Sequence, residues 1–221
     1  MYARLVASVC LINVCLFAAS SEPVNQGSNE VAVYIRPQDG VPATAIDAMR
    51  QETSSLMQTG GYQVQWLDRP REVTAAYLVM VELGHSCNTD SPSRTQVARK
   101  ALASAVVENG RILPFIKVNC AAAREFLIPA LGPGGNPEFL YGRALGRLLA
   151  HELYHVVGQT ADHTRGGVTQ AAVSVGELIS ERFMFCEAAV KTLRRHLESI
   201  DPDFAADPEA DARWNHPPPT R

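Results

Sequence analysis

The segment from Asn136 to Gly158 constrains the fold of this 221-residue chain more than any other. Asn136 is a good helix N-cap, Pro137 suits the first helical position, and Glu138 complements the positive end of the helix dipole. Apolar residues then recur at helical spacing as far as Val157. Gly158 is a plausible stop, because glycine adopts the left-handed conformation that ends many helices. The pattern predicts one long helix with an apolar face to bury.

This predicted helix carries the motif His151-Glu152-Leu153-Tyr154-His155, which has the form H-E-x-x-H. Residues four apart project from one face of a helix, so His151 and His155 can both reach one Zn²⁺ at about 2.0–2.1 Å. The helix period rotates Glu152 by about 100° from His151. Glu152 can therefore hold and deprotonate a metal-activated water without binding the ion. The motif predicts a zinc-dependent hydrolase, most simply a peptidase, with Glu152 as its general base.

A catalytic zinc needs a third protein ligand and an open fourth position. His163 follows soon after Gly158, with enough chain between them to turn beneath the metal. Glu177 and Glu181 are the alternatives, at the distance where thermolysin-like (gluzincin-type) enzymes place a ligating glutamate. The residues leave both possibilities open. We expect His163 to be the ligand, because a glycine turn followed by histidine needs no long return of the chain.

Together with Gly158, the motif resembles that of the metzincin clan of zinc peptidases, whose full pattern is H-E-x-x-H-x-x-G-x-x-H. The order of predicted elements ahead of it is similar to the N-terminal subdomain of that clan. Two features depart from the pattern. Position 161 is Ala161, so the third histidine arrives two residues late, at His163, and Met184 falls in a predicted helix instead of the methionine turn of the clan. The resemblance implies a divergent zincin with substrate extended along a sheet edge.

Five β-rich runs predict strands at Val31–Ile35, Tyr62–Leu67, Tyr77–Leu83, Ala103–Glu108 and Arg111–Val118. A helical pattern over Ala43–Thr59 ends at two glycines. Asn109-Gly110 is a strong signal for a hairpin between the last two strands. Pro114 cannot donate a ladder hydrogen bond, so its strand should lie at an edge or carry a bulge.

The C-terminal part is predicted to be helical. Ser174 and Glu177 form a capping box that starts a last helix, expected to continue to about Ile200. The acidic, alanine-rich and proline-rich residues 201–221 predict a disordered tail. We therefore expect an α+β, zincin-like fold in a single catalytic domain over residues 21–200. It would have a mixed twisted sheet, a long active-site helix and a smaller helical C-terminal part.

The first residues are typical of a secretory signal peptide. A short basic start is followed by the apolar stretch Leu5–Ala19 and by small residues before a polar segment. The apolar stretch is short of the roughly 20 residues that a spanning helix needs. We expect residues 1–20 to be removed and the mature protein to be exported, either secreted or periplasmic, with no stable membrane insertion.

Charge indicates which partners to expect. The chain has 20 Lys and Arg against 23 Asp and Glu, and the basic residues are scattered, which argues against a nucleic-acid partner. A peptide or protein substrate is the expected partner. The competing hypothesis is a non-catalytic exported protein with a structural zinc. A structural site closes with four protein ligands and has no use for an unligated Glu152, so we favour catalysis.

Three cysteines remain after removal of the signal peptide: Cys87, Cys120 and Cys186. In an exported protein two of them should pair. Cys87 and Cys120 both lie in turn-like sequence just after apolar runs, so we expect a disulfide between them. Cys186 lies in a helical pattern and is expected to be a buried free thiol.

A non-reduced digest of the mature protein should therefore contain a peptide linked through Cys87 and Cys120, with Cys186 reduced. Export supplies the oxidising compartment in which such a bond persists. Mass spectrometry of the digest with and without reductant decides the pairing. A linked peptide that contains Cys186 would show the assignment to be wrong.

Overall fold

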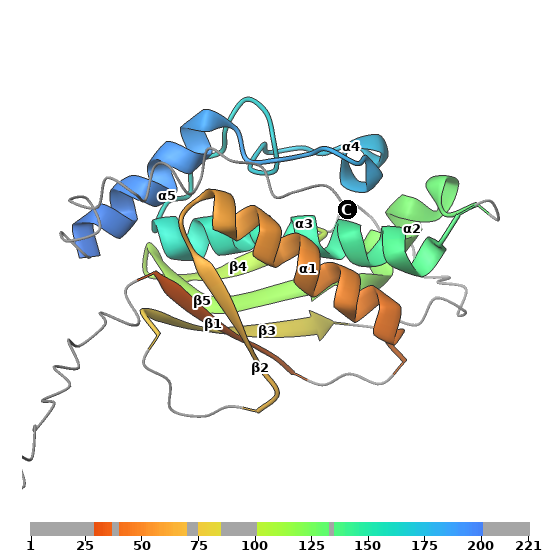
Figure 1. The fold of residues 1–221 in the computed structure, drawn as a ribbon, viewed down its shortest axis with the longest axis horizontal. Coiled ribbons are helices and arrows are strands. Elements are labelled where there is room, and N and C mark those ends of the chain that lie inside the picture. Colours follow the sequence, from red (N-terminus) through yellow and green to blue (C-terminus); the bar gives the residue numbers. More distant parts are fainter. Residues whose placement is uncertain (1–28, 37–39, 70–74, 85–100, 133–134, 201–221) are drawn as a thin grey trace, which may run out of the picture.

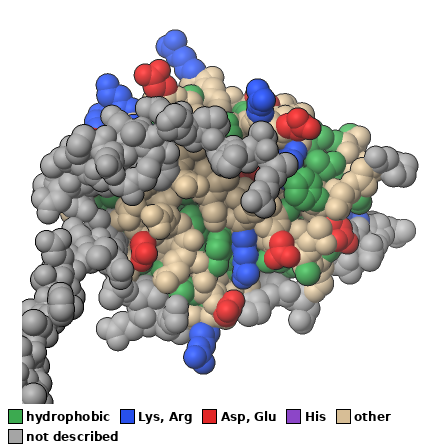
Figure 2. Space-filling view, in the orientation of Figure 1, with side chains coloured by type: hydrophobic (Ala, Val, Ile, Leu, Met, Phe, Trp, Pro, Cys, Tyr) green, Lys and Arg blue, Asp and Glu red, His purple; other side chains and the backbone are tan. Residues whose placement is uncertain are grey.

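The structure is a computed structural model that describes residues 29–36, 40–69, 75–84, 101–132 and 135–200 (Figure 1). The predicted signal peptide, the predicted tail and Cys87 lie outside these ranges. Among the helices within them, none is both long enough and apolar enough to cross a membrane. On the face shown in Figure 2, the basic and acidic side chains of the described residues are interspersed.

The described strands form one sheet, confirming the predicted positions. They are β1 (Glu30–Ile35), β2 (Gln63–Leu67), β3 (Tyr77–Gly84), β4 (Ala103–Glu108) and β5 (Arg111–Asn119). Their order is β2-β1-β3-β5-β4, and every pairing is parallel except that of β4 with β5. The turn between β4 and β5 has positive φ at both Asn109 (50°) and Gly110 (75°), as this hairpin sequence predicts. The sheet is therefore mixed, with β4 as an antiparallel edge strand.

Pro114 produces the irregularity expected of it, although its strand is not at an edge. Ala105 of β4 pairs with Ile116, whereas Val107 pairs with Ile112, so β5 contains extra residues around the proline. A proline has no N–H for the ladder, and the extra length carries the strand past it. This bulge lies in the part of the hairpin that borders the functional site.

The described helices are α1 (Ala43–Thr59), α2 (Cys120–Leu127), α3 (Pro137–Gly158), α4 (Val175–Ile179) and α5 (Glu187–Ile200), with a 3-10 turn η1 at Ile128–Ala130. Figure 1 shows α1 and α3 over the same face of the sheet, with α4 and α5 beyond α3. The hydrophobic core lies between the sheet and these two long helices. These features confirm the predicted α+β class, with a long helix and a smaller helical C-terminal part.

Two glycines on one face of α3 let its backbone touch that of α1. A Cβ on Gly142 would collide with the carbonyl oxygen of Ala45, and a Cβ on Gly146 would lie 2.8 Å from the carbonyl oxygen of Met49. The buried Thr53 hydroxyl donates a hydrogen bond of 3.1 Å to the Gly146 carbonyl. Such close contact leaves no room for a side chain between the helices, so α3 can pack against α1 in only one position.

Several predicted boundaries differ from the structure. The last helix is not continuous: the capping box of Ser174 and Glu177 is present, but α4 ends at Ile179 and α5 begins only at Glu187. A capping box specifies where a helix starts and carries no information about its length. The helix α2 was not predicted; Asn119 caps it by accepting a hydrogen bond from the Ala122 amide.

The helix α3 ends at Gly158, as predicted, but Gly158 is not the left-handed residue. The left-handed residue is Gln159, with φ 45° and ψ 43°. Met184 lies in the segment between α4 and α5 and its side chain is 45% exposed, so the prediction that it falls in a helix is wrong. Of the described cysteines, Cys186 is a free thiol, as expected, but half-buried, and Cys120 is not free. The Cys87–Cys120 pairing stays a prediction.

Replacing Gly142 with alanine should lower the free energy of unfolding by about 1–3 kcal/mol, the usual cost of forcing atoms into a packed contact. The new methyl group would press on the backbone of α1, which cannot rotate away as a side chain can. Urea unfolding of the mature protein measures the change.

Gly176→Ala is the matched control, because Gly176 is also helical and has nothing within 4 Å of the position of an added Cβ. It should leave the unfolding midpoint unchanged or raise it slightly. Equal midpoints for the two variants would contradict the packing account.

Candidate metal centre

The helix α3 carries the H-E-x-x-H motif into the centre of the molecule. Asn136 caps the helix, its Oδ1 accepting a hydrogen bond of 3.1 Å from the Phe139 amide, and Pro137 occupies the first turn. Around the motif, most α3 side chains are buried, so the helix cannot rotate about its axis without exposing apolar surface. His155 and Glu152 are themselves buried, at 8% and 7% exposure. The orientation of the motif therefore follows from the packing of its helix.

The two motif histidines are oriented by backbone carbonyls. Nδ1 of His151 lies 2.8 Å from the Val168 carbonyl oxygen, and Nδ1 of His155 lies 2.7 Å from that of Thr160. A carbonyl oxygen can only accept, so each Nδ1 must carry the ring proton and donate it. Each neutral ring is thereby left with an unprotonated Nε2, the tautomer that binds a metal through Nε2.

These two Nε2 atoms face each other at 3.1 Å. With both protons on Nδ1, the contact brings two lone pairs together and is repulsive unless a cation is shared between them. Burial lowers the pKa of His151 to about 4, a shift that its bond to Val168 opposes and that His155 and His163 reinforce. Burial also lowers the pKa of His155. Both rings are therefore neutral at neutral pH, the state in which imidazole binds a metal.

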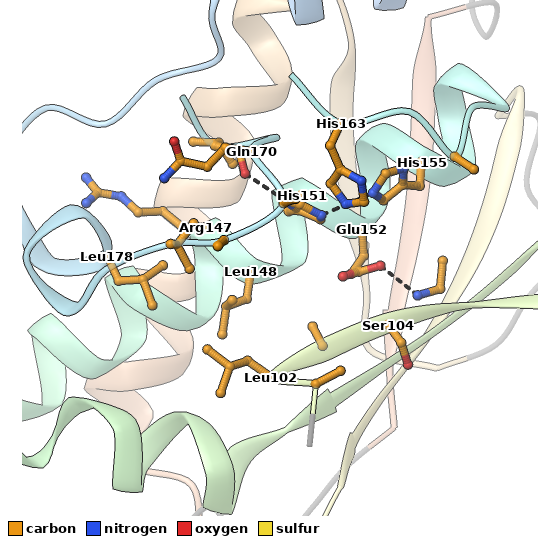
Figure 3. A pocket seen from close by; sticks show the side chains of 18 of the residues that line it. Leu102, Ser104, Arg147, Leu148, His151, Glu152, His155, His163, Gln170 and Leu178 are labelled. Carbon is orange, nitrogen blue, oxygen red and sulfur yellow. Dashed lines mark hydrogen bonds between the residues drawn. The ribbon is translucent and has the colours of Figure 1, made fainter. Parts of the chain in front are cut away.

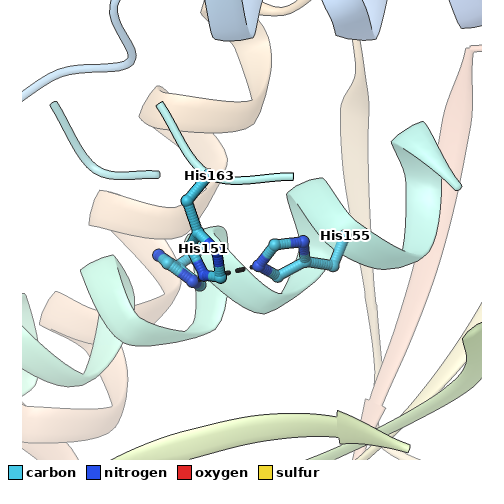
Figure 4. A group of neighbouring side chains, drawn as sticks. All are labelled: His151, His155 and His163. Carbon is cyan, nitrogen blue, oxygen red and sulfur yellow. Dashed lines mark hydrogen bonds between the residues drawn. The ribbon is translucent and has the colours of Figure 1, made fainter. Parts of the chain in front are cut away.

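His163 joins the two motif histidines from the loop that follows α3. Gln159 reverses the chain in the left-handed conformation, and the Thr160 amide donates a hydrogen bond of 3.3 Å to the His155 carbonyl. The ring centroid of His163 then lies 5.1 Å from that of His151 and 4.8 Å from that of His155. Figure 4 shows the three rings turned toward one common point.

The three histidines fit a divalent metal. One nitrogen from each ring can be chosen so that all three lie within 4.8 Å of one another. A tetrahedral zinc with Zn–N bonds of about 2.0–2.1 Å holds its nitrogens about 3.4 Å apart, which small side-chain movements would reach. Three neutral nitrogens leave the fourth position open, the arrangement found in catalytic zinc sites.

The two glutamates weighed as third ligands do not belong to this cluster. The Glu177 carboxylate accepts hydrogen bonds from the Ser174 amide and hydroxyl, both at 2.7 Å, and so completes the cap of α4. Glu181 is exposed, in the segment after α4. A carboxylate already used as a helix cap would have to break that cap to reach a metal.

Glu152 points from α3 toward the edge strand of the sheet. Its Oε2 accepts a hydrogen bond of 2.6 Å from the backbone amide of Ala105 in β4 (Figure 3). Burial raises the pKa of Glu152 to about 7, and the Ala105 bond opposes the shift. A carboxyl group that titrates near neutral pH is suited to exchange protons in both directions at that pH.

A cleft of about 540 Å³ opens beside the histidines and Glu152. One side is formed by β4 and the residues just before it, and the other by α3 and the segment from Val168 to Phe183. Beyond the histidines the walls are mainly apolar, with Leu102, Leu148 and Leu178 facing the space (Figure 3). A cleft of this size and polarity can enclose an apolar side chain next to the metal centre.

The Ala105 amide, the Val168 carbonyl and the cleft wall around Leu178 were not singled out from the sequence. The first two are backbone groups, which any residue type would supply, so no residue pattern marks them. Leu178 belongs to an apolar pattern that equally describes an ordinary buried helix face. Only the folded chain brings these groups to the histidines.

No protein-family model and no curated protein sequence matches this chain. Among solved structures, the fold is similar to the crystal structure of archaemetzincin from Methanopyrus kandleri, with a TM-score of 0.47 and 15% sequence identity. The match covers 79% of this chain and 99% of that one.

His163→Ala should weaken zinc binding by more than about 100-fold, above the 10–100-fold cost typical of losing a partner outside the coordination shell. The reason is that two histidines on one helix do not complete a zinc site. Zinc affinity, measured by competition with a chelator, gives the change.

Glu181→Ala is the control and should leave the affinity unchanged, since Glu181 is exposed and outside the cluster. If Glu181→Ala or Glu177→Ala weakened zinc binding as much as His163→Ala, a glutamate would have to replace His163 as the third ligand.

Proposed function

We propose that this chain is a zinc-dependent peptidase, with His151, His155 and His163 as zinc ligands and Glu152 as general base. The observation that carries the proposal is the pair of Nε2 atoms of His151 and His155, which lie 3.1 Å apart beside a third histidine while each Nδ1 contacts a backbone carbonyl. Such a contact is unfavourable without a cation. Glu152 is buried, lies outside the histidine cluster and faces the same cleft. It would therefore stay available for proton transfer when the histidines bind zinc.

Zinc held by the three histidines would supply a Lewis acid that polarises the scissile carbonyl and makes water nucleophilic at neutral pH. The backbone carbonyls of Val168 and Thr160 support this role from outside, because they fix the tautomer and the ring plane of His151 and His155. Three neutral histidine ligands would leave the full positive charge of a bound ion available to polarise the carbonyl.

Glu152 would accept a proton from the attacking water and later give it to the leaving amine. Only one of its oxygens, Oε2, bonds to the Ala105 amide, so Oε1 is free to take the proton. The amide also prevents the side chain from turning away from the cleft. Burial in an apolar wall strengthens the interaction of the carboxylate with charge that develops in the reaction.

The substrate would be an extended peptide that lies along β4. This strand is at the edge of the sheet and lines the cleft, so it can pair with a further strand through backbone hydrogen bonds. An apolar substrate side chain would then enter the space between Leu102, Leu148 and Leu178. Backbone pairing gives affinity for peptides in general, and the apolar space selects among them.

Each competing function conflicts with the surroundings of one glutamate. A gluzincin-type site would recruit Glu177 or Glu181 as ligand, against the cap that Glu177 makes with Ser174. A non-catalytic zinc protein would have no role for a buried carboxyl group beside the cluster whose pKa burial raises to about 7.

We further propose that the mature protein acts after export, because the first 20 residues have the pattern of a signal peptide.

Glu152→Gln should bind one zinc per chain as tightly as the unaltered protein but hydrolyse peptides at least about 100-fold more slowly, the lower range for loss of a general base. Glutamine has nearly the same shape and can still accept the Ala105 bond, but it cannot take up a proton. Peptide-library cleavage and metal analysis on the same preparations provide both readouts. Loss of zinc in step with activity, or undiminished cleavage, would contradict the assigned role.

A further inference from the structure

Two arginines of α3 reach away from the three histidines and toward the wall of the cleft. Arg147 lies one helical turn before His151, and its side chain is only 1% exposed. Arg143 lies one turn earlier and is half-buried. A buried arginine is rare because taking its charge out of water costs several kcal/mol unless every donor is satisfied.

The Arg147 guanidinium has partners on two different elements. Its Nε donates to the Glu52 carboxylate of α1 at 2.7 Å. One terminal nitrogen donates to the Glu177 carbonyl at 2.6 Å and to the Ser180 hydroxyl at 3.3 Å, and the other donates to the Ser180 carbonyl at 2.8 Å. The guanidinium therefore joins α1 to the C-terminal end of α4.

Arg143 adds to the same contact. One of its terminal nitrogens donates to the Ile179 carbonyl at 3.0 Å and to the Ser180 carbonyl at 3.1 Å. The last carbonyls of a helix have no partner within the helix and carry its negative dipole end. Together the two arginines satisfy the carbonyls of Glu177, Ile179 and Ser180.

The element held in this way is too short to be stable by itself. The helix α4 spans Val175–Ile179, and isolated helices much shorter than ~12 residues are marginal in water. Yet its residue Leu178 is 1% exposed and forms part of the cleft wall opposite Leu102 (Figure 3). The depth of the apolar space therefore depends on where the arginines hold α4.

We propose that Arg143 and Arg147 are positioning residues for substrate selection: by binding the carbonyls at the end of α4, they hold Leu178 in the cleft wall and so set the size of the apolar side chain that the cleft accepts. The selectivity part of this inference rests on the proposed peptidase function. The structural part, that the arginines hold α4, does not. The arginines act through α4 and do not touch the reacting atoms.

The test compares Arg147→Lys and Arg143→Ala with Glu52→Gln. Lysine keeps the charge, but its single ammonium cannot reach Glu52, Glu177 and Ser180 together. Glu52→Gln weakens the same buried ion pair but leaves the bonds to α4 in place, so it controls for lost stability. Arg143→Ala removes bonds to α4 without touching the ion pair, which keeps the test decisive should Arg147→Lys fold poorly.

Two measurements are made on each zinc-loaded variant. The first is the ratio of kcat/KM for two peptides that differ only by leucine or alanine at the position that the unaltered protein selects. A ratio is insensitive to the fraction of folded enzyme. The second is the hydrogen exchange of the Leu178 and Ser180 amides, which donate within α4 to the carbonyls of Ser174 and Gly176.

Both arginine variants should lower the leucine-to-alanine ratio by about ten-fold, the low end for a misfitted apolar pocket, and should speed exchange at both amides by a similar factor. Glu52→Gln should change neither. If Arg147→Lys matches Glu52→Gln in both measurements and Arg143→Ala has no effect, the proposal is wrong. An unaltered protein that cleaves without preference would overturn the selectivity part. One that cleaves nothing would overturn the proposed function, while exchange would still decide whether the arginines hold α4.

Discussion

The close contact between α3 and α1 is the constraint on which the rest of the structure depends. Gly142 and Gly146 remove the side chains that would separate the two helices, so backbone packs on backbone. The α3 helix is thereby fixed in height above the sheet and in rotation about its own axis. His151, Glu152 and His155 stand on the same helix, so a shift of α3 would displace all three together. The position of these motif residues therefore relies on two absent side chains earlier on the same helix.

The same helix organises three different neighbourhoods along its length. Its first turns meet α1, and Arg143 and Arg147 extend to the end of α4. Its later turns carry the histidines, whose Nδ1 atoms are held by carbonyls of the loops that follow. Glu152 faces the edge strand across the same cleft and accepts a hydrogen bond from the Ala105 amide. One rigid element thus sets the histidine pair, Glu152 and the cleft wall in fixed relation.

The polar groups buried in this region restrict the arrangement of the helices more than they stabilise the fold. A buried ion pair such as Arg147–Glu52 gains little net free energy, because desolvation offsets most of the attraction. The four hydrogen bonds that the Arg147 guanidinium donates nevertheless require one arrangement of α1, α3 and α4. The facing Nε2 atoms of His151 and His155 are likewise unfavourable by themselves. Each feature therefore needs a further partner: the Arg147 guanidinium needs the carbonyls of α4, and the facing histidine nitrogens need a cation.

Local signals in the sequence determined a large share of this protein. The bounds of α1, β4 and the Asn109-Gly110 turn, the cap at Asn136 and the capping box at Ser174 all follow from neighbouring residues. The motif on α3 also follows, since i and i+4 share a helix face whatever the fold. The tertiary structure decided what depends on distant chain segments. The helix α4 ends at Ile179, where the arginines of α3 bind the last carbonyls. Gln159, and not Gly158, takes the left-handed conformation that turns His163 back to the cluster. Backbone groups such as the Ala105 amide belong to every residue alike, so only the fold could select them.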